Sequence, residues 1–275
     1  MPSVNDPTIP VYSASIGSWK FSVSRRPLGA LELAERYDRM AAKWSHLTGR
    51  LGYPQAYERL WIQFLSEAGL MPAGYPLRLL DCGVGTGSFA LAFARAWAAP
   101  VCVDAVDVSE VMIEQAQRHF RQEGHDASIQ CADVGALPYS DNQFDLVMAA
   151  HVLEHLPDSV AALEEMRRTL KPEGWLVLCL TRESILGSYV QLKWRTHRLT
   201  LKRSESWLTA AGLNVERMNL ASSGWFKQTS ITCVGRKPAQ LCRTGPMDKP
   251  ARPNTYPDDD FRNRISKRYS QSNRP

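Results

Sequence analysis

The sequence predicts an α/β fold, with a seven-stranded, mostly parallel β-sheet that has helices on both faces and is preceded by N-terminal helices. From Leu77 onward, short apolar runs alternate with longer amphipathic runs, which is typical of repeated strand–helix units. The first of these runs ends directly in a glycine-rich loop, residues 81–87, and an acid, Asp107, closes the second run. In such a sheet, ligands bind outside the carboxyl ends of the strands.

The segment before the sheet divides according to its apolar pattern. Residues 1–25 have little periodic apolar pattern and many Ser and Pro residues, so we expect a flexible arm there. In residues 26–75, apolar side chains recur mostly at steps of three and four residues, first around Tyr37 and Trp44 and again after Gly52. This spacing predicts a cap of amphipathic helices.

The strands and helices of the sheet follow in order along the chain. Strands are predicted over residues 77–81, 101–106, 128–131, 144–149, 174–181, 214–219 and 230–235, and helices over residues 87–97, 110–121, 159–170 and 205–211. Right-handed crossovers bring the carboxyl ends of the parallel strands to one edge. Residues 238–275 are rich in Pro, Ser, Asn and basic residues, so we expect a disordered basic tail after a folded domain over residues 26–237.

Charge and cysteine usage exclude several classes of protein. The net charge is +5, but the excess of Lys and Arg lies after Arg236, so the body is near neutral and no nucleic-acid partner is expected. The six cysteines form no C-x-x-C pair, which favours the reducing cytoplasm. We expect neither a signal peptide nor a membrane span, because the longest apolar stretch, residues 89–103, is interrupted by Arg95 and Pro100.

The loop over residues 81–87 has glycines at every second position, Gly83, Gly85 and Gly87. Glycines are needed where the backbone turns sharply or approaches a ligand closely. Asp107 follows about 20 residues later, the spacing at which an acid reaches ribose hydroxyls in a nucleotide-binding unit. A dinucleotide site prefers G-x-G-x-x-G, and here the third glycine comes one residue early. An NAD site is therefore disfavoured, although glycines alone also suit a purely structural turn.

Five motifs follow one another along the chain: residues 81–87, Asp107, residues 132–138, residues 144–156 and residues 170–176. As a set in this order they resemble the class I, Rossmann-like S-adenosylmethionine-dependent methyltransferases, in the broad small-molecule group of type 11 and type 25. The resemblance implies S-adenosylmethionine as the cofactor and a strand order of 3-2-1-4-5-7-6, with strand 7 antiparallel.

The resemblance also assigns cofactor contacts. It implies that the loop from Asp81, with Gly83, Gly85 and Gly87, lies against the methionine part and the ribose, and that Asp107 holds the ribose hydroxyls. It further implies that Asp133 accepts a hydrogen bond from the adenine amino group, that Val108 packs on the adenine face and that Val134 donates its backbone N–H. An ionised carboxylate suits an exocyclic amine because it can only accept.

Residues of the acceptor site are less clearly marked. His151 follows the strand whose end faces the transferring methyl group, where it would orient an acceptor or remove a proton; a structural histidine fits equally well. Residues 151–155 spell the zinc-protease motif H-x-x-E-H, which we reject because no third ligand is evident. The resemblance implies that residues 182–199 cover the acceptor pocket. The alternatives are that the aromatic candidates pack in the core and that the basic ones lie on a solvated helix face. The pocket candidates are Tyr37, Trp44, Tyr189, Trp194 and Arg195.

The expected activity is in-line transfer of a methyl group from S-adenosylmethionine to an oxygen, nitrogen or carbon atom of a small molecule. The protein then mainly aligns the acceptor in a water-poor pocket. The chain reads Ala149-Ala150-His151-Val152 where enzymes that methylate base amino groups carry Asp or Asn and two prolines, so those substrates are disfavoured. The alternatives are a nucleic-acid or protein methyltransferase that uses the basic tail, a non-catalytic S-adenosylmethionine-binding protein and an NAD-dependent oxidoreductase.

Overall fold

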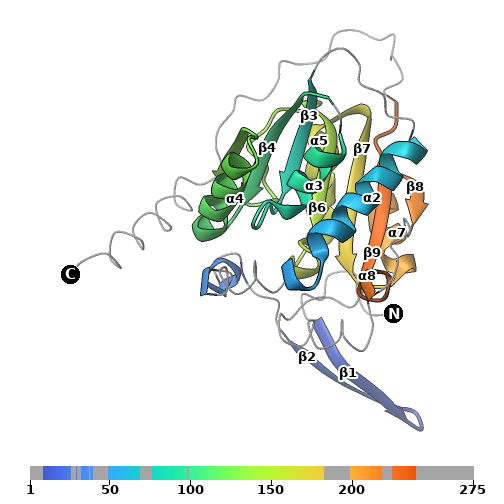
Figure 1. Cartoon of the computed structure of the whole chain (residues 1–275). Helices are drawn as coiled ribbons and strands as arrows, with labels where there is room; N and C mark the ends of the chain where they lie inside the picture. The colour runs from blue at the N-terminus through green and yellow to red at the C-terminus, as the bar shows by residue number, and fades with distance from the viewer. Residues whose placement is uncertain are drawn as a thin grey trace, which may run out of the picture. The chain divides into compact units, whose positions relative to one another are not determined.

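The computed structural model describes residues 9–25, 29, 32–36, 38–39, 49–68, 76–97, 99–182, 199–218 and 225–239 (Figure 1). Its centre is a seven-stranded sheet in the order β5-β4-β3-β6-β7-β9-β8. The strands are β3 (Leu77–Cys82), β4 (Val101–Asp107), β5 (Ala127–Cys131), β6 (Phe144–Ala150), β7 (Leu170–Thr181), β8 (Asn214–Met218) and β9 (Ser230–Arg236).

The strand order confirms the predicted 3-2-1-4-5-7-6 arrangement. Strands β3 to β7 pair in parallel, whereas β9 runs antiparallel to both of its neighbours, β7 and β8. Parallel neighbours place the ends of β3, β4 and β6 at one edge of the sheet. The glycine loop, Asp107 and His151 all lie at these ends.

Helices cover both faces of this sheet (Figure 1). Their bounds are α2 (Tyr53–Ala68), α3 (Ser88–Ala96), α4 (Glu110–Gln122), η1 (Leu153–His155), α5 (Ser159–Thr169), α7 (Leu201–Ala210) and α8 (Trp225–Thr229). Buried side chains of α2, α3 and α4 form one core cluster with one face of the strands, and those of α5 and α7 form a second cluster with the other face. Successive residues of a strand point to opposite faces, which explains why Leu79 belongs to the first cluster and Leu80 to the second.

Predicted and observed bounds differ by more than one residue at two of the predicted elements. Helix α7 begins at Leu201, earlier than predicted, because the Thr200 side chain caps it by accepting a hydrogen bond from the backbone N–H of Arg203. Strand β7 begins at Leu170, which pairs with Phe144 across a shift in register. The pattern around Gly174 therefore marked the middle of a longer strand.

Residues 9–25 differ from the expected flexible arm. They form an antiparallel hairpin of β1 (Ile9–Ile16) and β2 (Trp19–Arg25), with Ile16 paired to Trp19. We expected a flexible arm and no strands here, although apolar and polar residues alternate along β2. Gly17, with φ of 59°, supplies the left-handed conformation that a two-residue hairpin turn needs.

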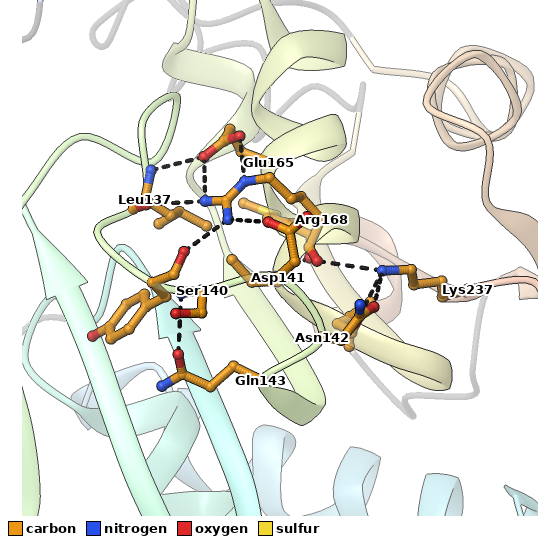
Figure 2. Close-up of polar contacts among 12 residues, drawn as sticks. Leu137, Ser140, Asp141, Asn142, Gln143, Glu165, Arg168 and Lys237 are labelled. Atoms are coloured by element: carbon orange, nitrogen blue, oxygen red, sulfur yellow. Dashed lines mark hydrogen bonds and ion pairs between the residues drawn. The ribbon is translucent and has the colours of Figure 1, made fainter. Parts of the chain in front are cut away.

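The connection between β5 and β6 is fastened to helix α5 (Figure 2). The Arg168 guanidinium donates to the backbone oxygens of Leu137 and Tyr139, at 3.0 and 2.7 Å, and to the carboxylates of Glu165 and Asp141. Glu165 in turn accepts from the Leu137 backbone N–H at 3.0 Å. Hydrogen bonding to these carboxylates raises the pKa of Arg168, and both backbone groups of Leu137 are thereby held in place.

No helix in the described part of the chain is long and apolar enough to span a lipid bilayer.

Candidate active site

A cavity of about 330 Å³ opens at the carboxyl edge of the sheet. The loops after β3, β4, β5 and β6 line it, together with the start of α2 and two described residues of the N-terminal segment, Gly29 and Leu33. Its walls include Tyr53, Tyr57, Gly83, Val84, Gly85, Phe89, Asp107, Val108, Met112, Asp133, Val134, His151, Val152, His155 and Ala161. Most of the residues predicted to contact a cofactor thus meet around one cavity.

The three glycines of the loop have left-handed backbones for different reasons. Their φ angles are 78°, 52° and 83° at Gly83, Gly85 and Gly87. A Cβ atom on Gly83 would overlap the Val152 side chain, and one on Gly87 would lie 3.0 Å from the Phe120 ring. A Cβ atom on Gly85 would meet nothing within 4 Å, and Gly85 lines the cavity. Gly83 and Gly87 allow close packing, whereas Gly85 leaves room for a ligand.

Asp107 is attached to the glycine loop. Its Oδ2 accepts a hydrogen bond from the Gly85 backbone N–H at 2.8 Å, and its Oδ1 accepts from the Ser109 backbone N–H at 3.0 Å. Ser109 caps helix α4 and donates its hydroxyl to Asp38. Burial raises the pKa of Asp107, although the backbone N–H groups of Ser109 and Gly85 oppose this by favouring the charged form. The acid is therefore held at the cavity wall in a defined orientation.

Asp81 and Gly87 do not line the cavity. Asp81 is 1% exposed at the end of β3, where burial and the neighbouring Asp107 raise its pKa to about 8. The structure therefore buries the Asp81 carboxyl next to Asp107, away from the cavity.

Asp133 and Val134 line the cavity from the loop after β5. The Asp133 Oδ1 accepts from the Gly135 backbone N–H at 2.8 Å, which closes a tight turn and fixes the carboxylate next to the cavity. Val134 is buried, and Val108 lines the cavity from the turn after β4. Val108, Asp133 and Val134, to which the resemblance assigns the adenine contacts, thus line the same cavity.

His151 lies directly after β6 and lines the cavity with a φ of 58°, in the left-handed region. Its Nδ1 is 2.9 Å from the Thr181 hydroxyl and 3.3 Å from Glu154 Oε1, and its Nε2 is 3.6 Å from the Cys179 sulfur. Burial lowers the pKa of this imidazole, but contacts with Cys179 and Glu154 raise it overall above the usual value. Burial raises the pKa of Glu154, but the contacts with His151 lower it overall to about 2.

The acid of the H-x-x-E-H spelling makes its hydrogen bonds with protein groups. Glu154 lies in η1 and accepts from Thr181 and His151. Within the ranges that the structure describes, no group of three or more His, Cys, Asp or Glu side chains is arranged to hold a metal ion.

Several cavity residues were not predicted. Tyr53 and Tyr57 line the cavity from α2, and the Tyr53 ring meets His151 edge-on, with ring centroids 5.8 Å apart. Tyr57 belongs to the helical stripe found in the sequence, but periodicity does not tell which part of a stripe meets a cavity. The predicted pocket residues Tyr37, Trp44, Tyr189, Trp194 and Arg195 lie outside the described residues.

Known proteins share the sequence of this region. Residues 80–178 match a family model described as "Methyltransferase domain". A ubiquinone/menaquinone biosynthesis C-methyltransferase from Cupriavidus taiwanensis is 35% identical over 117 residues, which are 42% of this chain and 47% of the relative. A ubiquinone biosynthesis O-methyltransferase from Parvibaculum lavamentivorans is 28% identical over 208 residues, 66% of this chain and 80% of the relative. The chain thus spans about half the length of the C-methyltransferase that it matches.

The fold is shared with solved methyltransferase structures. Magnesium protoporphyrin IX methyltransferase from Synechocystis PCC 6803, solved with bound S-adenosylhomocysteine, superposes with a TM-score of 0.60 at 18% identity. The match covers 76% of this chain and all of that one. Motif order, sheet topology and the glycine loop with its acid agree with the family model, and residues 80–178 are a methyltransferase domain with the class I fold.

Proposed function

We propose that the protein transfers the methyl group of S-adenosylmethionine to an oxygen, nitrogen or carbon atom of a small molecule. The observation that carries this proposal is the link between Asp107 and Gly85. The acid bonds the loop through the Gly85 backbone N–H, and Gly85 opens onto the cavity. One rigid unit therefore presents both a carboxylate for ribose hydroxyls and space for the sugar.

The residues present fit the cofactor. A volume of about 330 Å³ lies within the range of small-molecule sites. Asp107 and Asp133 stand on neighbouring strand ends, as a nucleoside with hydroxyls at one end and an amino group at the other requires. When bound, S-adenosylmethionine supplies an activated methyl group on a sulfonium. The protein's part is to orient the acceptor and exclude water.

The acceptor end of the cavity suits a small, partly apolar molecule. Tyr53, Tyr57 and Phe89 contribute aromatic rings to the wall, and His151 adds a polar group among them. Aromatic walls with few polar groups favour planar or apolar ligands over phosphates. The curated relatives named for ubiquinone biosynthesis support an acceptor of this kind.

Two further expectations belong to this proposal. We infer a cytoplasmic location, which the free state of the described cysteines supports. We also infer that no nucleic acid takes part, since the body of the chain is near neutral.

Calorimetry with S-adenosylhomocysteine tests the cofactor site. The ribose contacts of a charged group are worth about 1.5–3 kcal/mol each, so Asp107→Ala should weaken binding by roughly 10- to 150-fold, and Asp133→Ala by a smaller factor. Asp126→Ala, an exposed acid before β5 at the opposite edge of the sheet, is the matched control. Absence of binding by the wild type, or unchanged affinity in both variants, would refute the site.

A second assay tests turnover. The full chain is incubated with methyl-labelled S-adenosylmethionine and a metabolite extract, and labelled products are separated. Label in a small molecule supports the activity. Cofactor binding without any label transfer would instead establish a non-catalytic S-adenosylmethionine-binding protein.

A further inference from the structure

The N-terminal hairpin of β1 and β2 forms a two-stranded sheet of its own. Directly paired residues of an antiparallel hairpin lie on the same face, and successive rows lie on opposite faces. Alternate rows of this hairpin are apolar, whereas the rows between them hold serine and lysine. The apolar rows are Ile16 with Trp19, Ala14 with Phe21 and Tyr12 with Val23. One face of the hairpin is therefore apolar along most of its length.

The aromatic end of this apolar face is exposed. Trp19 keeps 73% of its surface exposed and Phe21 keeps 56%, the two largest fractions among the large apolar residues that the structure describes. Among the described helices and strands, each strand of the hairpin packs substantially only on the other. A two-stranded hairpin is at best marginally stable in water, and an exposed apolar face of this kind marks a binding surface. The exposed aromatic residues therefore point to a partner that covers them.

The same segment carries only positive charge. Residues 7–31 contain Lys20, Arg25 and Arg26 but no Asp or Glu. Lys20 follows Trp19 directly after the turn, and Arg25 ends β2. Aromatic and basic residues side by side are typical of segments at the membrane–water interface, where the rings enter the interface and the cations stay with the headgroups. The hairpin thus has the composition that complements an anionic lipid surface.

A protein partner fits these observations less well. A stable protein interface takes about 20–30 residues from each side, whereas the apolar face offers the six positions of its three paired rows. If two copies of the chain joined through their hairpins, the three basic residues of each segment would approach those of the other, and like charges oppose association. A lipid surface needs no matching shape, and anionic headgroups attract basic segments. The observations therefore favour a lipid surface.

We propose that the β1–β2 hairpin binds the surface of an anionic lipid bilayer, with Trp19 and Phe21 in the interfacial region and the positive charge of the segment attracted to the phosphate headgroups. The aromatic rings enter only this interfacial region, so the binding requires no membrane-spanning helix. Two aromatic residues and a few cations give weak and reversible attachment. The inference goes beyond methyl transfer and does not depend on it.

Flotation of the full chain with lipid vesicles tests the proposal. One set of vesicles contains phosphatidylcholine alone, and the other contains phosphatidylcholine and phosphatidylglycerol in equal parts. The wild type should float with the anionic vesicles and not with the neutral ones. Trp19→Ser/Phe21→Ser should weaken binding to the anionic vesicles by at least about tenfold, because the burial of both rings is lost. Ile62→Ser, at an exposed apolar residue of α2, is the matched control and should bind like the wild type.

Two further variants leave the apolar face in place. Lys20→Gln/Arg25→Gln should weaken binding to the anionic vesicles by about fivefold for each charge removed. Trp19→Phe keeps an aromatic ring and should keep most of the binding. Lipids with brominated acyl chains should quench the tryptophan emission of the bound wild type, and this quenching should fall in Trp19→Phe. Thermal unfolding of each variant close to that of the wild type shows that the methyltransferase domain stays folded.

The basic residues 238–275 are the same in every variant, so they cannot account for a difference between variants. The proposal is overturned if the wild type does not float, if it floats equally with both kinds of vesicle, or if Trp19→Ser/Phe21→Ser floats like the wild type. Sedimentation velocity without lipid tests the other occupant. A wild-type dimer that becomes monomeric in Trp19→Ser/Phe21→Ser would show that a second copy of the chain covers the face, and it too would overturn the proposal.

Discussion

Replacing two glycines of the loop by alanine should lower the stability of the protein by different amounts. An alanine at Gly83 or Gly85 must adopt a positive φ, which costs about 1–2 kcal/mol. At Gly83 the new methyl group also overlaps Val152, and overpacking of this kind costs about 1–3 kcal/mol more. Gly83→Ala should therefore lose about 2–5 kcal/mol of stability, and Gly85→Ala only about 1–2 kcal/mol.

Thermal unfolding measures this difference directly. For a domain of this size, 1 kcal/mol lowers the melting temperature by about 2–4 °C. Gly83→Ala should then melt about 4–20 °C below the wild type, and Gly85→Ala about 2–8 °C below it. Adding Val152→Ala should recover part of the loss at Gly83 and none at Gly85, since only Gly83 faces that side chain.

Cofactor affinity provides a second test at Gly85. The methyl group of Gly85→Ala points into open space at the cavity wall, so it should weaken binding of S-adenosylhomocysteine by at least about tenfold. Equal melting temperatures for the two variants would refute the packing argument. Wild-type affinity in Gly85→Ala would refute the placement of the ligand against this glycine.

Two further predictions concern charged groups around the site. The pKa of Asp81 is raised to about 8 from 3.8, so the stability tied to its neutral form is complete below pH 3.8 and is lost as the pH rises toward 8. Asp81→Asn should be more stable than the cofactor-free wild type at pH 7, by up to about 4 kcal/mol, and should lose this advantage near pH 4. Urea unfolding at both pH values measures the difference. An equal advantage at both pH values would contradict the prediction. Arg168→Lys should destabilise the protein by about 1–3 kcal/mol and weaken S-adenosylhomocysteine binding, because Lys cannot replace the forked contacts that hold Leu137, close to Asp133. Arg121→Lys, on the exposed side of α4, is the matched control for unfolding and binding, and equal effects of the two substitutions would show that the loop is held by other means.

The local sequence pattern was sufficient to predict most strands of the sheet. Each buried strand is a short apolar run bounded by turn residues, so its place is visible from its own neighbours in the sequence. Strand bounds were predicted less well where pairing with a neighbouring strand decides them. Strand β7 begins at Leu170, which pairs with Phe144 on β6. The N-terminal hairpin was missed although β2 alternates apolar and polar residues and Gly17 marks the turn. Its many Ser and Pro residues had been interpreted as a flexible arm.

The sequence by itself predicted the methyltransferase domain and the proposed cofactor contacts, because Gly83, Gly85 and Asp107 lie at strand ends and their spacing is a local property of one strand–helix–strand unit. Only the tertiary structure decided which side chains surround His151. Glu154 and Thr181 are far apart in the chain, and they meet at His151 because β6 pairs in parallel with β7 and places Ala150 beside Cys179. Periodicity specifies which face of an element is apolar, but only the packing of elements against one another specifies which side chains share a cavity.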